Sequence, residues 1–244
     1  MKKLIFFLTL LTLLLVAKTS VAADNELPPG LTDRGPLTKI TFIHYRHPEA
    51  RPSGVTKNKS AGCYSFLAKG ARWKNPENYE LNLSGTTLSP DFVQNVFSQG
   101  VVEWEKYGGP DIFGAGAVNN SAPYDTSWTD GRNVAVFGNY LDNRVIAVTT
   151  VWGYFYGPLS TREILEWDML FNNVYRWGDA KLDDPTVMDL QNIATHELGH
   201  SAGMNDLYNT CTLETMYGYS GYGETIKRDL NLGDQAGIKA LYGY

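Results

Sequence analysis

The sequence predicts an α+β fold for one sizeable domain within a chain of 244 residues. Short β-branched or alternating runs, which are typical of strands, are mixed with stretches at helical spacing that carry start and stop signals. Apolar residues make up 43% of the chain and charged residues 19%, as in ordinary globular proteins. The net charge of −5 argues against nucleic acid or an anionic membrane as the main partner. We expect a globular monomer that binds neither.

The first 23 residues have the pattern of a signal peptide that is removed on export. Met1 to Lys3 supply a basic start, and small residues end the segment at Ala23. The apolar run between them, 4–17, has about 14 residues, which is shorter than the roughly 20 of a membrane-spanning helix. We therefore expect a secreted, extracellular protein that is not attached to a membrane after cleavage.

Residues 24–62 are expected to be either a pro-segment or an extended N-terminal arm. They are rich in Pro, Gly and basic residues and have little apolar periodicity. Within them only 39–43 has the pattern of a strand. His44 and His47 follow that run three residues apart, and we interpret them as structural or solvent-facing histidines rather than as a metal pair.

From residue 63 to residue 244 the sequence is denser in apolar residues and forms the main domain. Alternation predicts a strand over 79–83. A helix is expected from Ser89, a favourable cap, to about Lys106, because Pro90 and Asp91 suit its first turn. Residues 108–132 are loop-rich. Further strands are expected in three runs that are β-branched or alternate along the chain: 133–137, 144–151 and 164–172.

Two later helices complete the predicted elements. The helix over 189–202 has an apolar side that can face the core. The last helix, about 233–241, is marked by Asn231 and by Asp234 three residues later, which together form a capping arrangement.

The two cysteines, Cys63 and Cys211, are expected to form a disulfide, since the chain is directed to an oxidising space. Such a bond would join the start of the domain to a loop near residue 211. The alternative is that the Cys63 thiolate caps a metal and keeps the protein latent, which would leave Cys211 unpaired.

An acidic loop contains Asp179, Asp183 and Asp184, whose carboxylates could chelate Ca²⁺. The spacing matches no EF-hand loop, so we favour a solvated loop.

The residues of greatest chemical interest lie between 196 and 206. His196 and His200 are four apart, so on a helix their imidazoles share one face and can bind one Zn²⁺. Glu197 is then placed to take a proton from a zinc-bound water. Gly203 permits a sharp turn that could bring Asp206 round as the third ligand. The stretch predicts a zinc-dependent endopeptidase with Glu197 as general base.

This pattern, His196-Glu197-xx-His200-xx-Gly203-xx-Asp206, resembles the zinc-binding signature of metzincin peptidases. Met216 is placed like the Met-turn of that family, and 230–243 resembles the closing helix of its matrixin branch. The resemblance spans about 70–244. It implies that 63–244 is a metzincin catalytic domain with the zincin fold. That fold has a twisted, mostly parallel sheet, an active-site helix and a small irregular C-terminal subdomain closed by a helix. One catalytic zinc and protein or peptide substrates are also implied.

Two positions depart from the matrixin pattern. Most matrixins have a third His where this chain has Asp206. An anionic ligand should acidify the metal-bound water less, so we expect activity at higher pH than in an Asp206→His variant. Gly218 replaces the proline that follows the Met-turn, and Tyr217 and Tyr219 could form the wall of the substrate pocket instead.

Extended substrates pair with exposed sheet edges, and 144–151 is the expected edge strand. Two alternatives to a metzincin peptidase remain. In a gluzincin-type peptidase, Glu214 or Glu224 would be the third ligand, although the surrounding Gly- and Tyr-rich sequence has no helical pattern. In a non-catalytic secreted zinc-binding module the histidines would be needed but Glu197 would not.

Overall fold

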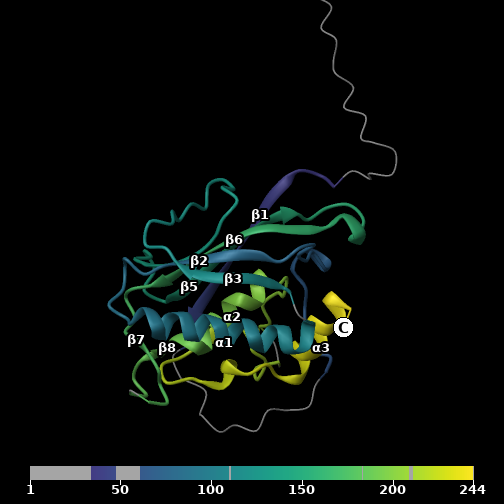
Figure 1. Ribbon diagram of the computed structural model, residues 1–244. Coiled ribbons are helices and arrows are strands. Elements are labelled where there is room, and N and C mark those ends of the chain that lie inside the picture. The colour runs from purple at the N-terminus through teal and green to yellow at the C-terminus, as the bar shows by residue number, and fades with distance from the viewer. Residues whose placement is uncertain (1–33, 48–60, 110, 183, 209–210, 244) are drawn as a thin grey trace, which may run out of the picture. The chain divides into compact units, whose positions relative to one another are not determined.

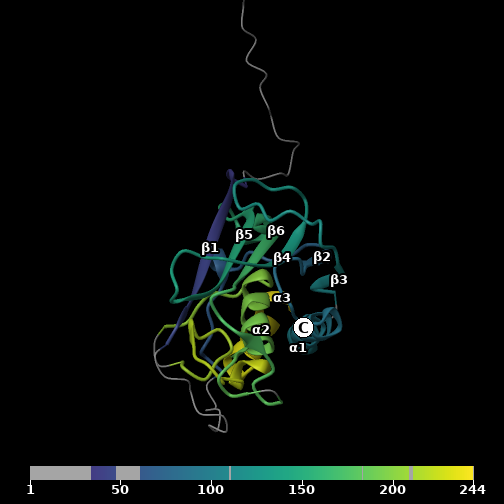
Figure 2. The ribbon, with the colours of Figure 1, turned by 90° about the vertical axis from the view of Figure 1, so that its left-hand side faces the viewer.

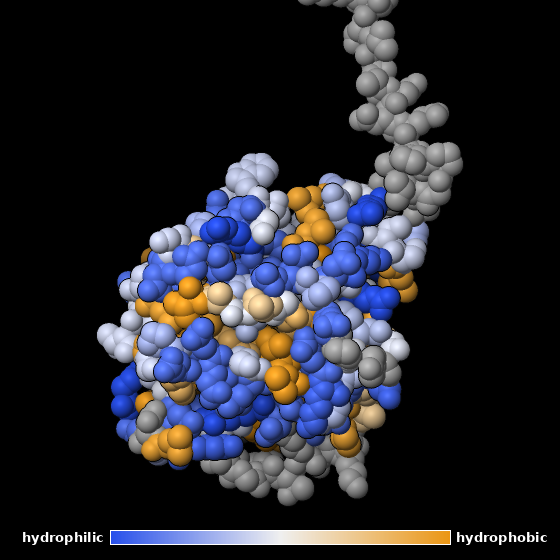
Figure 3. Space-filling view, viewed as in Figure 1, coloured by the Kyte–Doolittle hydropathy of each residue, from blue (hydrophilic) through white to orange (hydrophobic). Residues whose placement is uncertain are grey.

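The computed structural model describes residues 34–47, 61–109, 111–182, 184–208 and 211–243, all within the compact unit Thr32–Tyr244 (Figure 1). The predicted signal peptide, 1–23, lies outside the described residues. Among the helices of the described part, none is long and apolar enough to cross a membrane. Seen from the side of Figure 1, apolar side chains form small separate groups on a mostly hydrophilic surface (Figure 3).

One sheet of seven strands dominates the described residues, in the order β3-β2-β4-β6-β5-β1-β9. β2, β3, β4 and β6 run parallel to one another, and β5 is antiparallel to β6. β1 pairs antiparallel with β5 and parallel with β9. The predicted α+β fold with a mostly parallel sheet is confirmed. The strands are β1 Leu37–Arg46, β2 Glu77–Asn82, β3 Phe113–Val118, β4 Asn133–Gly138, β5 Val145–Tyr154, β6 Glu163–Asn172 and β9 Tyr219–Ser220.

The helices α1 (Pro90–Gly108), α2 (Leu190–Ser201) and α3 (Leu232–Tyr242) lie on one side of this sheet (Figure 2). Their bounds differ from the predicted ones by only one or two residues. A Cβ at Gly100 of α1 would come within 2.7 Å of Leu198 Cδ1, so glycine allows α1 to approach α2 closely. The shorter elements are β7 Trp177–Gly178, β8 Met188–Asp189 and the 3₁₀ turns Leu67–Lys69, Leu159–Thr161 and Ile226–Arg228.

The strand β3 lies in 108–132, for which the sequence predicts only loop, so that prediction is wrong for Phe113–Val118. Glycines weaken a strand pattern, and β3 contains Gly114 and Gly116. The ring of Tyr79 on β2 covers Gly116 so closely that a Cβ there would collide with it. Gly116 thus weakens the strand pattern in the sequence, yet the packing of Tyr79 requires a glycine at this position.

The expected edge strand is also not an edge. β5 covers the predicted run 144–151, but β1 pairs along its outer side from Leu37 opposite Tyr154 to Tyr45 opposite Val145. The predicted strand 39–43 is thus the centre of a longer strand that belongs to the sheet. An unpaired strand edge can hydrogen-bond to any extended segment. The sequence of 144–151 therefore did not show that β1, an earlier part of the chain, pairs with it.

Cys63 and Cys211 form a disulfide, which fixes the residues that follow the N-terminal arm to the loop after α2. The alternative in which the Cys63 thiolate caps a metal is therefore wrong in this structure. The sulfur is held in the disulfide instead.

Candidate metal centre and active site

The helix α2 presents His196 and His200 from consecutive turns, and both side chains are buried. Asp189, the residue before the helix, caps its first turn, because Asp189 Oδ1 accepts a hydrogen bond from Asn192 N at 2.8 Å. Arg228 from the C-terminal part also pairs with the Asp189 carboxylate. The helix is thereby anchored at the end opposite the histidines.

A sharp turn after α2 brings Asp206 to the two histidines. Gly203 has φ +98°, and a Cβ there would lie 2.5 Å from the carbonyl oxygen of Ala71, so the turn favours glycine on both counts. Asp206 Oδ1 lies 3.3 Å from His196 Nε2 and 3.5 Å from His200 Nε2. The structure thus brings together the three predicted ligands.

The three converging atoms fit a zinc ion. His196 Nε2, His200 Nε2 and Asp206 Oδ1 are all buried without a hydrogen-bond partner, although such atoms are costly to leave unpaired. The opposite ring nitrogens are satisfied: His196 Nδ1 donates to the Thr215 carbonyl at 2.7 Å and His200 Nδ1 to the Met204 carbonyl at 3.1 Å. These bonds fix the tautomer that leaves each Nε2 lone pair for a metal.

Electrostatics favour an ionised Asp206. Burial by itself would raise the pKa of this carboxyl, but the neighbouring His200 and His196 lower it far below its ordinary value. Burial lowers the pKa of His196 to about 3. For His200 the effect of burial is outweighed by Asp206, and the pKa is raised. The site therefore combines one carboxylate with imidazoles, a donor set that suits Zn²⁺.

Glu197 lies beside this group with both carboxylate oxygens engaged. Thr149 Oγ1 on β5 donates to Oε2 at 2.6 Å, and His44 Nδ1 on β1 lies 3.0 Å from Oε1. The side chain is fully buried, which raises its pKa to about 7. A carboxyl tuned to this range can both accept and return a proton near neutral pH.

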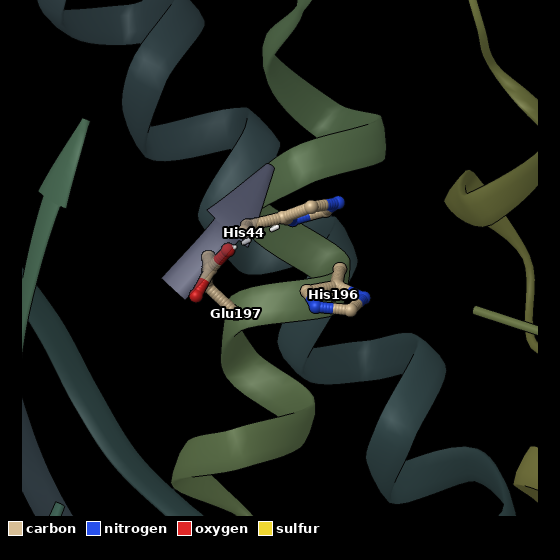
Figure 4. Close-up of side chains that lie close together, drawn as sticks. All are labelled: His44, His196 and Glu197. Atoms are coloured by element: carbon tan, nitrogen blue, oxygen red, sulfur yellow. Dashed lines mark hydrogen bonds and ion pairs between the residues drawn. The ribbon is translucent and has the colours of Figure 1, made fainter. Parts of the chain in front are cut away.

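The residues that cover the site come from β1 and were not identified from the sequence as part of it. His44 is 1% exposed, points at Glu197 and lies beside His196 (Figure 4). Two residues earlier on the same strand face, the ring of Phe42 stacks on His200 with centroids 3.8 Å apart. The sequence left open whether His44 is a structural or a solvent-facing side chain, and the structure shows that it is buried. Its alternation with Phe42 is the only local signal that the two share a face.

Three further residues support the ligands. Tyr208 donates from its hydroxyl to Asp206 Oδ2 at 2.9 Å and so orients the carboxylate. Met216 is buried and packs against Gly199 under the histidine turn, the position expected of a Met-turn. Thr215 contributes the carbonyl that holds His196. Nothing in the spacing of Tyr208 marks it in the sequence.

The predicted pocket residues Tyr217 and Tyr219 lie beside each other, with ring centroids 5.7 Å apart. Tyr219 begins β9 and pairs with Tyr45 of β1. The Tyr217 carbonyl accepts a hydrogen bond from the ammonium of Lys227, a buried residue that the sequence did not single out. The same ammonium lies 3.0 Å from His44 Nε2, so this wall of the site is joined to β1.

The alternative ligands lie elsewhere. Glu214 accepts hydrogen bonds from Asn231 and from the first backbone groups of α3, and Glu224 accepts one from Ser220. Within the described ranges, the groups of side chains close enough to share a metal are His196, His200 and Asp206, and His44, His196 and Glu197. Neither glutamate belongs to them, which argues against the gluzincin alternative.

In the described part of the acidic loop, arginines pair with the two carboxylates that the structure describes. Asp179 pairs with Arg228 at 2.6 Å and Asp184 with Arg176 at 2.6 Å. Asp183, the third predicted carboxylate, lies outside the described residues. The two described carboxylates are thus balanced by arginines.

Comparison with known families agrees with this geometry. The family model described as Matrixin matches residues 123–243, which include α2, the turn at Gly203 and α3. The comparison with curated proteins gives no match.

Proposed function

The chain is a matrixin-like metzincin and hence a zinc-dependent metallopeptidase, and we propose that it is a secreted endopeptidase in which His196, His200 and Asp206 hold the zinc and Glu197 is the general base. The observation that carries the assignment is the convergence of three buried, unpaired ligand atoms beside a buried glutamate. The signal-peptide pattern and the disulfide support secretion.

When bound, zinc would supply Lewis-acid polarisation of the scissile carbonyl and activation of water. The chain supplies the proton transfer. Thr149 holds Glu197 Oε2, so we assign Oε1, the oxygen that His44 contacts in this structure, as the one that accepts the water proton and returns it to the leaving amine. Met216 beneath α2 and Tyr208 on Asp206 keep the ligands in position while this proton moves.

Endopeptidase action is supported by the way a chain can cross the site. β1 runs past the candidate ligands with Leu37 before them and Arg46 after them, so this edge accommodates an internal stretch of polypeptide. A substrate held in the same way would be cut within its sequence. Its backbone would pair with β5, and its side chains would meet Tyr217 and Tyr219.

The test compares Glu197→Ala with wild type for zinc content and for degradation of casein. Both proteins are also made with His44→Ala, because His44 contacts the oxygen assigned to proton transfer. Loss of a general base typically lowers turnover by about 10²–10⁴-fold. We expect such a loss with zinc retained. If zinc is bound but casein is not degraded by any of these proteins, including those with His44→Ala, the non-catalytic zinc-binding module is favoured instead.

A further inference from the structure

The edge of β5 is where an extended substrate would add a strand, and a segment of the chain itself already occupies it. Eight successive residues from Leu37 to His44 pair with 147–154 without a break in register. The next residues, Tyr45 and Arg46, pair with β9 on the other side. The segment therefore lies between the two walls that a peptide substrate would need, β5 and the tyrosine-containing β9.

Side chains from one face of this segment cover the assigned catalytic groups. Phe42 stacks on the ring of His200 with an interplanar angle of 6°, and the ring of His44 lies 4.0 Å from that of His196. Both covering residues are buried, at 7% and 1% exposure. Two alternate positions on one strand are thus enough to exclude another chain from both histidine ligands.

The two hydrogen bonds of His44 determine which ring nitrogen donates and which accepts. The ammonium of Lys227 lies 3.0 Å from His44 Nε2 and can only donate, so Nε2 accepts. Nδ1 then carries the proton and donates to Glu197 Oε1 at 3.0 Å. Both ring nitrogens are used, which makes His44 a cap on the glutamate rather than a further metal ligand. Since Thr149 holds Oε2, neither oxygen of Glu197 is left for water.

We propose that Leu37–Arg46 is an internal inhibitory strand, which keeps the protein latent by filling the substrate edge and by capping Glu197 through His44. This inference rests on the proposed peptidase function. Latency then comes from a strand bound like a substrate, because the sulfur of Cys63 is held in the disulfide and has no free thiol to offer. Activation then requires β1 to leave β5, whereas the Cys63–Cys211 bond keeps the residues after the arm attached to the domain.

The first test uses the full zinc-loaded chain and two readouts, cleavage of a fluorogenic peptide and affinity for a fluorescent peptide hydroxamate, which binds zinc without being cleaved. The variant is Phe42→Ala/His44→Ala, and the matched control is Ile43→Ala, which lies between them and points to the other face. We expect the double variant to bind the hydroxamate at least about tenfold more tightly and to cleave faster by a similar factor, because several contacts that compete with binding are lost. The control should change neither by more than about twofold.

Unchanged hydroxamate affinity in the double variant, with zinc retained, would overturn the inhibitory strand. If the double variant binds the hydroxamate more tightly but cleaves no peptide, β1 covers the site as proposed and the peptidase function is wrong. Failure of the inhibitory strand and failure of the peptidase function therefore give different results.

A second test avoids weakening the fold. A recognition sequence for a specific protease replaces residues 52–57, and the folded, zinc-loaded protein is nicked there. Hydroxamate affinity should rise once the N-terminal fragment is separated by gel filtration, and a synthetic peptide of residues 34–47 should reverse the rise. Separation of the fragment with no gain in affinity, or no reversal by the peptide, would contradict the proposal.

Discussion

The site has two halves that differ in how they are built. α2 and the turn after it supply His196, Glu197, His200 and Asp206 from 11 consecutive positions of the chain. β1 supplies His44, which meets Glu197 across a sequence separation of 153 residues. The first half depends on local helix geometry, and the second on strand pairing with β5. This difference teaches that the groups assigned to the chemistry and the groups proposed to restrain it are encoded at different ranges in the same chain.

The largest expected effect breaks the local half. Removing a direct ligand should cost more than the roughly 10–100-fold in metal affinity that is typical of outer partners. We therefore expect Asp206→Ala to lower zinc affinity at least about 100-fold, measured by competition with a chelator. Glu224→Ala is the matched control and should leave the affinity near that of wild type. The opposite order of the two variants would restore the gluzincin alternative.

The turn between the ligands gives the next effect. Gly203→Ala places a Cβ 2.5 Å from the Ala71 carbonyl at a φ of +98°. We expect the free energy of unfolding to fall by about 1–3 kcal/mol, as for other strained left-handed positions. Denaturant unfolding measures the change, with Gly131→Ala as control because its φ is also positive but no atom lies within 4 Å of a Cβ there. Equal losses in the two variants would show that the close approach to Ala71 contributes nothing.

Tyr208 sharpens the local half further. Its hydroxyl donates to Asp206 Oδ2, so Tyr208→Phe should lower zinc affinity by about tenfold, the lower end of the range for outer partners. Tyr222→Phe, an exposed tyrosine of the neighbouring loop, serves as control. Isothermal titration at one pH compares them. An affinity equal to that of wild type would mean that Asp206 is oriented by its backbone alone.

A carboxyl of the sheet should have the smallest effect on the metal site, and it separates the stability of the fold from the site. Burial, followed by the charge of Glu166, raises the pKa of Asp168 on β6 to about 8. The folded protein therefore keeps this proton between pH 4 and 8 while the unfolded chain releases it, so stability falls as pH rises through that window. We expect Asp168→Asn to reduce this fall by about 3 kcal/mol between pH 5 and pH 8. Thermal unfolding at both pH values is the measurement, and parallel curves for the two proteins would contradict it.

The sequence was sufficient for the local half because its geometry follows from spacing. Residues four apart on a helix share a face, and glycine three residues later permits the turn, so the positions of His196, His200 and Asp206 could be predicted. The three helices and the strands β2, β4, β5 and β6 also had clear patterns. β3 did not, because Gly116 has to leave room for Tyr79.

The second half could not be predicted because no local pattern encodes it. His44 and Phe42 alternate as in any strand, and their partners lie on α2, more than 150 residues later. Lys227 reaches the site from a 3₁₀ turn, and Tyr208 from a loop, at spacings that follow no helical or strand period. The strand predicted over 144–151 is present as β5, but only the fold shows that β1 covers it.

The central claim is that α2 and its turn supply the complete set of protein ligands while β1 only covers them. X-ray absorption at the zinc edge of the full-length protein tests it most directly. We expect two imidazole nitrogens and carboxylate oxygen at about 2.0–2.2 Å, no sulfur, and an unchanged first shell in His44→Ala. A third imidazole that disappears in His44→Ala, or a sulfur ligand at about 2.3 Å, would contradict the account.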